Sequence, residues 1–235
     1  MKSSAGAVPL PRAIIFDWDN TLVDAWPAVH DALNTALAAM DQPTWTLDET
    51  RARVRKSLRD SFPEMFGSRW TDARKIFYDR YTRVHLDHLV PLEGAAEGVA
   101  WLASQGLYLG IVSNKAGSYL RQEAVALGWD SYFGKIVGAT DAKFDKPDPA
   151  PVEMALDGSG IGAGPDVWFV GDAAIDVECA LNAGLTPVVF FGDGTEAELH
   201  HHNLIQFVNA KCRLQGMSGL KELVQDRIAP ISGGC

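Results

Sequence analysis

The chain has 235 residues, 47% of them hydrophobic and 22% charged, and its 30 acidic against 21 basic side chains give a formal net charge of −9. This length and apolar content exclude disorder as the main state and favour one domain, or one domain with an insertion. The acidic balance argues against a nucleic-acid partner, and the apolar runs are far shorter than the ~20 residues of a membrane-spanning helix. A small phosphorylated ligand is compatible with this charge, because a local site can oppose it.

The N-terminal segment and the cysteines indicate the compartment. Residues 1–12 contain Lys2 and two prolines but no apolar segment of a secretory signal. The three cysteines, Cys179, Cys212 and Cys235, have neither the spacing of a metal site nor that of a redox motif. An odd cysteine count makes a disulfide framework unexpected, so we expect a cytoplasmic protein.

Short apolar runs alternate with helical stretches along most of the chain. The runs are typical of strands buried on both faces, and they cover 13–17, 107–113, 135–139, 167–171 and 187–191. The helical stretches between them cover 93–105, 118–127, 150–156 and 175–183. Strand alternating with helix predicts an α/β fold with a doubly wound, Rossmann-like parallel sheet in a three-layer α/β/α arrangement.

The stretch from 25 to 90 departs from this alternation. It contains no convincing strand, and helices are predicted over 26–40, 48–58 and 71–88. Because the stretch is too long for a crossover in a compact sheet, we interpret it as a small inserted helical domain. The predicted division is an α/β core over 1–24 and 91–235 and a helical cap domain over 25–90.

Three tryptophans of the predicted cap leave the oligomeric state open. Trp26, Trp45 and Trp70 could form the core of the cap or a dimer face. We therefore expect a monomer or a homodimer.

Carboxylates gather directly after the first predicted strand. Ligands of open α/β sheets bind at the carboxyl ends of the strands, so Asp17 and Asp19 lie where an active site would be. Two carboxylates one residue apart can divide the work of phosphoryl transfer, one as nucleophile and the other as general acid and base. Taken alone, the run is equally compatible with an ordinary turn rich in Asp and Asn.

Three further strand ends carry residues suited to a phosphate and a metal ion. Ser113 and Asn114 provide a hydroxyl and an amide for phosphate oxygens after the second strand. Lys146, beside a proline after the third, is a point charge that can offset a phosphate and an attacking carboxylate. Asp172 and Asp176 follow the fourth strand, and hard oxygen ligands of this kind suit Mg²⁺. Four such groups at four predicted strand ends indicate one site.

This set resembles the motifs of the haloacid-dehalogenase-like hydrolase superfamily over nearly the whole chain. The matching residues are, in motif order, Asp17, Asp19 and Thr21; Ser113; Lys146; and Gly171, Asp172 and Asp176. The position of the helical insertion is similar to the superfamily's first, C1-type cap. Ser113-Asn114-Lys115 and Asp145-Lys146-Pro147 look most like the phosphoglycolate phosphatase branch. Ala173 departs from the pattern, since many relatives have Thr or Ser there.

The resemblance implies a Mg²⁺-dependent phosphatase that hydrolyses a small phosphorylated metabolite through an aspartyl-phosphate intermediate. Asp17 would be the nucleophile, and Asp19 the general acid and then the base. The implied Mg²⁺ ligands are Asp17, Asp19 (through its backbone carbonyl), Asp172 and Asp176, the last acting through water or by orienting Lys146. The implied phosphate-binding residues are Thr21, Ser113, Asn114 and Lys146.

The basic residues of the cap and the histidine run are open to two interpretations each. Arg55, Lys56 and Arg59 occupy the stretch that forms a specificity loop in relatives and would suit an anionic substrate, although a solvated helix face explains them equally well. The run from His200 to His202 lies beyond the last predicted strand, which favours a polar surface turn over a metal tract. Cys179 is expected to be a buried small hydrophobe.

The alternatives to a phosphatase are other enzymes of the same fold and a protein without catalytic activity. A phosphomutase would retain and reorient its intermediate under the cap, and a phosphonate hydrolase would need Lys56 as a Schiff base. A dehalogenase is disfavoured, because it needs neither an acid at the position of Asp19 nor a metal. A non-catalytic phosphate-binding regulatory module would not need the complete set of motif residues.

Overall fold

The computed structural model describes residues 8–54, 58–192 and 195–228. The chain divides into two compact units. The first comprises the residues up to Val23 and those from Pro91 on, and the second comprises Asp24–Val90. Each unit has its own buried apolar side chains, and each is described separately below.

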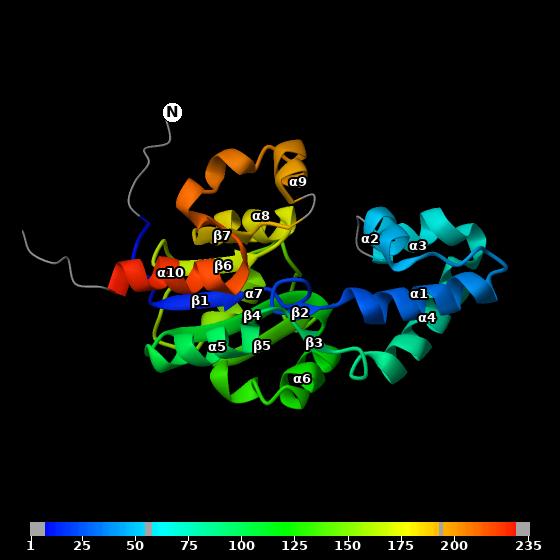
Figure 1. The fold of residues 1–235 in the computed structure, drawn as a ribbon, viewed down its shortest axis with the longest axis horizontal. Helices are drawn as coiled ribbons and strands as arrows, with labels where there is room; N and C mark the ends of the chain where they lie inside the picture. The colour runs from blue at the N-terminus through cyan, green and yellow to red at the C-terminus, as the bar shows by residue number, and fades with distance from the viewer. Residues whose placement is uncertain (1–7, 55–57, 193–194, 229–235) are drawn as a thin grey trace, which may run out of the picture. The chain divides into compact units, whose positions relative to one another are not determined.

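The first unit is built around a parallel sheet of six strands in the order β5-β4-β1-β6-β7-β8 (Figure 1). The strands are β1 (Ala13–Phe16), β4 (Tyr108–Ala116), β5 (Lys135–Ala139), β6 (Val167–Gly171), β7 (Thr186–Phe190) and β8 (Arg213–Leu214). Every residue of β1 and β6 is buried, which is why both read as unbroken apolar runs. The predicted α/β fold with a doubly wound parallel sheet is confirmed.

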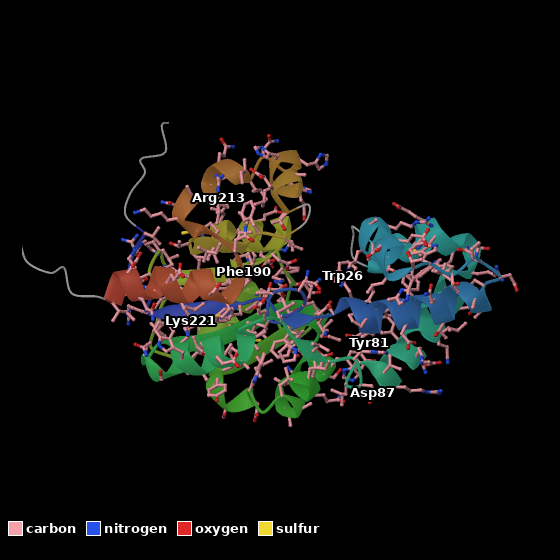
Figure 2. The ribbon with its side chains drawn as sticks, viewed as in Figure 1. Trp26, Tyr81, Asp87, Phe190, Arg213 and Lys221 are labelled. Carbon is pink, nitrogen blue, oxygen red and sulfur yellow. The ribbon has the colours of Figure 1, made fainter. Side chains whose placement is uncertain are left out.

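Helices cover both faces of this sheet. They are α5 (Ala95–Ser104), α6 (Gly117–Ala126), α7 (Ala150–Leu156), α8 (Ala174–Asn182), α9 (Thr195–His201) and α10 (Gly216–Ile228). Because parallel crossovers are right-handed, α5 and α6 lie on one face and α7 and α8 on the other. On the first of these faces α10, which carries Lys221 (labelled in Figure 2), packs against α5. The Lys221 ammonium lies 5.5 Å from the ring centroid of Trp101.

One continuous core joins the sheet to α7 and α8. It contains Ile15, Val112, Val137 and Phe169 from the strands and buried residues such as Val152 from the helices. A fully buried Ile, Val or Phe side chain contributes roughly 1.5–3 kcal/mol to folding. This packing fixes the strands, and with them the positions of the loops that follow them.

The winding of the sheet reverses between β1 and β6. From β1 the chain proceeds to β4 and β5 on one side, and from β6 it proceeds to β7 and β8 on the other. Ligands of such sheets bind in the crevice outside the carboxyl ends of the strands at this reversal. Because Phe16 pairs in register with Val170, the residues after β1 and β6 emerge at the same edge.

The second unit is helical and has an aromatic core. Its helices are α1 (Trp26–Ala39), α2 (Leu47–Arg53), α3 (Leu58–Phe66) and α4 (Trp70–Val84). Phe62 packs against Phe66 and Phe77, and Phe77 stacks on Tyr81 with 5.7 Å between ring centroids. Arg80 joins α4 to α1 by donating from Nε to Asp31 Oδ1 (2.6 Å) and from Nη2 to Oδ2 (2.9 Å).

Several predicted boundaries are wrong in the structure. The helix predicted over 48–58 is instead α2, which begins earlier because Thr46 and Glu49 form a reciprocal capping box, and a separate α3. The helix predicted to reach 88 ends at Val84. The predictions missed α9, α10, β8 and the paired short strands β2 (Val23–Asp24) and β3 (Val90–Pro91).

The side chains of the three tryptophans are half-buried, so none of them lies at the centre of the aromatic core. A role of Trp26, Trp45 and Trp70 in a dimer stays a prediction. In the described part of the chain, no helix has the length and apolar character needed to cross a membrane.

The Asp31–Arg80 pair predicts a pH-dependent contribution to stability. Hydrogen bonding from Arg80 lowers the pKa of Asp31 in the folded protein, although partial burial opposes this. A lowered folded-state pKa stabilises the protein above the unfolded-state pKa of about 3.9, and this stabilisation is lost as the pH falls through the folded-state pKa. We therefore expect Asp31→Asn to lower the melting temperature by a few degrees at pH 7 but much less at pH 3.

Thermal melting of both proteins at the two pH values measures this difference. Asp41→Asn is the matched control, because the Asp41 side chain is 91% exposed. An equal effect of Asp31→Asn at pH 7 and pH 3 would show that the charge of Asp31 is not what stabilises the helix pair.

Candidate active site

A tight turn after β1 presents the first carboxylates. The backbone N–H of Asp17 donates to the carbonyl of Val170 in β6 (2.9 Å), so the start of the turn stays attached to the sheet. The carbonyl of Trp18 accepts from the N–H groups of Leu22 (2.9 Å) and Val23 (3.2 Å), which closes the turn. Asn20 has a φ of 60°, a left-handed conformation that Asn adopts more readily than most residues.

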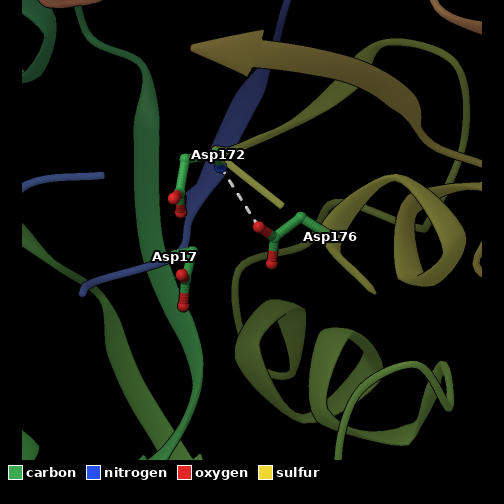
Figure 3. A group of neighbouring side chains, drawn as sticks. All are labelled: Asp17, Asp172 and Asp176. Atoms are coloured by element: carbon green, nitrogen blue, oxygen red, sulfur yellow. Dashed lines mark hydrogen bonds between the residues drawn. The ribbon is translucent and has the colours of Figure 1, made fainter. Parts of the chain in front are cut away.

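Three carboxylates from two strand ends meet at the edge of the sheet (Figure 3). Asp17 follows β1, Asp172 follows β6 and Asp176 lies in the first turn of α8. Each offers an oxygen within 4.8 Å of the other two. Burial, followed by repulsion from Asp176 and Asp17, raises the pKa of Asp172 well above its ordinary value. These groups therefore favour a cation between them.

Lys146 lies beside two of these carboxylates. Its Nζ donates to Asp17 Oδ1 and to Asp176 Oδ1, at 2.7 Å each, and its side chain is only 3% exposed. Burial alone would lower the pKa of Lys146, but the charges of Asp17 and Asp176 raise it well above its ordinary value. The ammonium is therefore charged, and removing one partner of such a buried group costs about 3–5 kcal/mol.

Both carboxylate oxygens of Asp176 accept hydrogen bonds. Its Oδ2 accepts from the backbone N–H groups of Asp172 (3.2 Å) and Ala173 (3.0 Å), the first of which is the dashed line in Figure 3. Its Oδ1 accepts from Lys146. Because both oxygens are engaged, this geometry suits the orienting role that the resemblance allowed for Asp176.

The residues expected to bind phosphate also support their neighbours. The Thr21 hydroxyl donates to Asp172 Oδ1 (3.2 Å). The Asn114 side chain donates to the Lys146 carbonyl (3.1 Å) and accepts from the Lys146 N–H (3.0 Å), so it fixes the backbone that carries the lysine. The Ser113 side chain is buried, and its Oγ accepts from the N–H of Lys115 (3.3 Å). The role of all three in phosphate binding stays a prediction.

Asp19 does not share the group of three carboxylates but contacts a second buried lysine. Lys115 Nζ lies 2.6 Å from Asp19 Oδ1 and 2.6 Å from Glu123 Oε2. Burial raises the pKa of Asp19 above its ordinary value, although Lys115 lowers it.

Sequence reasoning missed Glu123 and assigned no role to Lys115. Glu123 lies on the buried face of α6 with Leu120 and Ala124. The helical spacing of these three residues could have predicted from the sequence that Glu123 is buried.

Other residues that the sequence singled out lie away from these strand ends or outside the described residues. Arg55 and Lys56 lie outside the described residues, as does the side chain of Arg59, so their role in specificity stays a prediction. His200 and His201 are exposed residues of α9 rather than of a turn. The Cys179 side chain is buried, which raises the pKa of its thiol to about 12, and it therefore behaves as the small hydrophobe that was expected.

Comparisons with known proteins agree on the relatives of this chain. The family model described as haloacid dehalogenase-like hydrolase matches residues 14–190. A phosphoglycolate phosphatase of Pectobacterium atrosepticum is 30% identical over 185 residues, covering 75% of this chain and 79% of the relative. One from Yersinia pestis is 31% identical over 183 residues, covering 74% and 78%.

A solved structure shares the fold. The crystal structure of a HAD-superfamily hydrolase, subfamily IA, variant 1, from Geobacter sulfurreducens has a TM-score of 0.72 and 21% identity, and the match covers 92% of this chain and 97% of that one.

The close approach of Gly171 to Asp176 predicts a sensitive position. A Cβ atom at Gly171 would overlap the Asp176 carboxylate, which is held by Lys146 and the start of α8. We expect Gly171→Ala to lower the melting temperature by several degrees, because the buried carboxylate must move. Gly162→Ala is the matched control, since a Cβ there meets no atom within 4 Å. Equal melting temperatures for the two variants would contradict the packing argument.

Proposed function

Because the chain belongs to the haloacid dehalogenase-like hydrolases, we propose that it is a Mg²⁺-dependent phosphatase acting on a small phosphate monoester, with phosphoglycolate as the first candidate substrate. The observation that carries this proposal is the buried group in which Lys146 is shared by Asp17 and Asp176 next to Asp172. The relatives named phosphoglycolate phosphatases support the choice of substrate.

The donor set fits a magnesium ion. When all three carboxylates of this group are ionised, the single ammonium of Lys146 leaves two negative charges uncompensated. Hard carboxylate oxygens are the ligands that Mg²⁺ takes together with water and a substrate phosphate. We assign the ion to the side chains of Asp17 and Asp172 and to the backbone carbonyl of Asp19, with Asp176 beside them. When bound, the ion offsets the charge of the incoming phosphate and of the transition state.

The protein residues then divide the reaction between them. The Asp17 carboxylate attacks phosphorus and becomes an aspartyl phosphate, while the Lys146 ammonium keeps Asp17 oriented and offsets the charge of the phosphoryl oxygens. Asp176 holds Lys146 in place. Asp19 gives a proton to the oxygen of the departing alcohol. In the second step, Asp19 takes a proton from the water that hydrolyses the aspartyl phosphate. For both steps, Thr21 holds Asp172, and Asn114 holds the backbone of Lys146. Ser113 holds the end of β4.

The other candidate functions share the fold and are separated by experiment. A phosphomutase would return phosphate to its substrate rather than release it. A phosphonate hydrolase would need Lys56, which lies outside the described residues. A monomeric or homodimeric state and a cytoplasmic location stay predictions.

The nucleophile is tested by phosphate release from a panel of metabolites with Mg²⁺ or with EDTA. The panel contains phosphoglycolate, sugar phosphates, nucleoside monophosphates, pyrophosphate and a phosphonate. We expect Mg²⁺-dependent release by the wild-type protein and a loss of about a thousandfold or more in Asp17→Asn, because an amide cannot attack phosphorus.

Asp157→Asn is the control for this loss, since the Asp157 side chain is 77% exposed and pairs with Lys135 at the surface. Wild-type turnover by Asp17→Asn would remove Asp17 as the nucleophile. Phosphate release from no member of the panel by the folded wild-type protein would favour a mutase or a binding module.

Magnesium binding has a readout that is independent of activity. A ligand that binds only the folded state raises the melting temperature. We expect millimolar Mg²⁺ to raise the melting temperature of the wild-type protein and of Asp157→Asn, but not that of Asp172→Asn, which lacks one proposed ligand. A wild-type shift that survives in Asp172→Asn would place the ion elsewhere.

A further inference from the structure

A second buried lysine connects Asp19 to the interior of the first unit. The Lys115 side chain is 6% exposed and comes from the end of β4. Its Nζ lies 2.6 Å from Asp19 Oδ1 and donates to Glu123 Oε2 at 2.6 Å. Lys115 therefore joins the carboxylate assigned as general acid and base to a carboxylate of α6.

Glu123 is a fixed anchor rather than a mobile counter-ion. It is 1% exposed, and its Oε2 also accepts from the indole N–H of Trp18 at 2.7 Å. Trp18 is itself fully buried and meets Trp129 edge to face, with 5.9 Å between ring centroids. Since Trp18 lies between Asp17 and Asp19, Glu123 holds both Lys115 and the turn that follows β1.

Stability alone is a weak reason for this arrangement. Taking an ammonium and a carboxylate out of water carries a desolvation cost that their attraction often fails to exceed, and apolar residues of similar volume often serve a core as well or better. The arrangement does orient Asp19, because Lys115 engages Oδ1 and thereby limits rotation of the carboxyl group.

We propose that Lys115, anchored by Glu123, is a positioning residue that holds Asp19 through Oδ1 and directs Oδ2 at the leaving oxygen of the substrate. This inference rests on the proposed phosphatase function. As the Asp17 oxygen forms its bond to phosphorus, the bond from phosphorus to the ester oxygen breaks, and the proton of Asp19 moves to that oxygen to give the alcohol. The Asp19 carboxylate that results is the base of the second step. A misdirected Oδ2 slows the departure of an alcohol that must be protonated.

The dependence on the leaving group separates this role from a general loss of structure. Benzyl phosphate releases a poor leaving group that needs the proton, whereas 4-nitrophenyl phosphate releases one of similar size that leaves without it. The kcat/KM values of both esters report formation of the aspartyl phosphate. For Lys115→Met we expect kcat/KM to fall at least about tenfold more with benzyl phosphate than with 4-nitrophenyl phosphate, and Asp19→Asn should show the same pattern.

Two further variants keep the test interpretable. Lys115→Met leaves Glu123 buried without its cation, so the double variant Lys115→Met with Glu123→Gln removes both charges together, and melting curves verify that it folds. It should show the same leaving-group dependence as the single variant. Lys135→Met is the matched control, because it breaks a lysine–carboxylate pair of the same 2.6 Å length at the surface. It should change neither ester's kcat/KM.

The possible outcomes distinguish failure of the positioning role from failure of the phosphatase function. An equal loss with both esters, or no loss, in the Lys115 variants would overturn the positioning role while the phosphatase function stands. Leaving-group dependence in Asp19→Asn without it in the Lys115 variants would show that Asp19 is oriented by other contacts. Failure of the wild-type protein to hydrolyse any phosphate ester would instead overturn the proposed function, and this role with it.

Discussion

The repulsion between carboxylates gathered at one strand edge is the constraint on which the site depends. Asp17, Asp172 and Asp176 are brought within a few ångströms by β1, β6 and α8, and the substrate that we propose adds a further anion. Such a group can stay ionised in a folded protein only if cations share it. Lys146 supplies one positive charge from within the chain, and the remaining negative charge is the reason that the residues suit a divalent ion.

The topology of the sheet makes this concentration of charge possible. β1 lies between β4 and β6, so the residues that follow all three strands emerge at one edge, next to the reversal of the winding. The apolar strands behind that edge are buried against helices on both faces. They provide the free energy that offsets the cost of ordering several charged side chains together.

The same physical device occurs twice at this edge, with different partners. Lys146 is shared by the proposed nucleophile and Asp176, whereas Lys115 is shared by the proposed acid and Glu123. In both cases one carboxylate is assigned to the chemistry and the other anchors the lysine from a helix. In the mechanism that we propose, the Lys146 pair faces the phosphoryl group and the Lys115 pair faces the leaving group. Separate anchors allow the two proposed catalytic carboxylates to lie two positions apart in the sequence and yet have different surroundings.

The sequence by itself determined the class of the fold and the membership of the charged group. Apolar runs and the polar residues that follow them are local properties, and parallel strands necessarily bring their carboxyl ends to one edge, so Asp17, Lys146, Asp172 and Asp176 could be assigned together. Helix ends in the second unit were predicted less well from the apolar period alone, and the capping box at Thr46 that sets the start of α2 was a sequence signal left unused.

Only the tertiary structure decided what each polar side chain contacts. Thr21 reaches Asp172, which lies 151 positions away, and Asn114 reaches the backbone of Lys146, 32 positions away. Glu123 meets Trp18 across 105 positions, and no local pattern encodes such a pairing. The physical reason is that a hydrogen bond depends on atomic separations within a few tenths of an ångström. Those separations are set by how the strands and helices pack, not by the residues on either side in the chain.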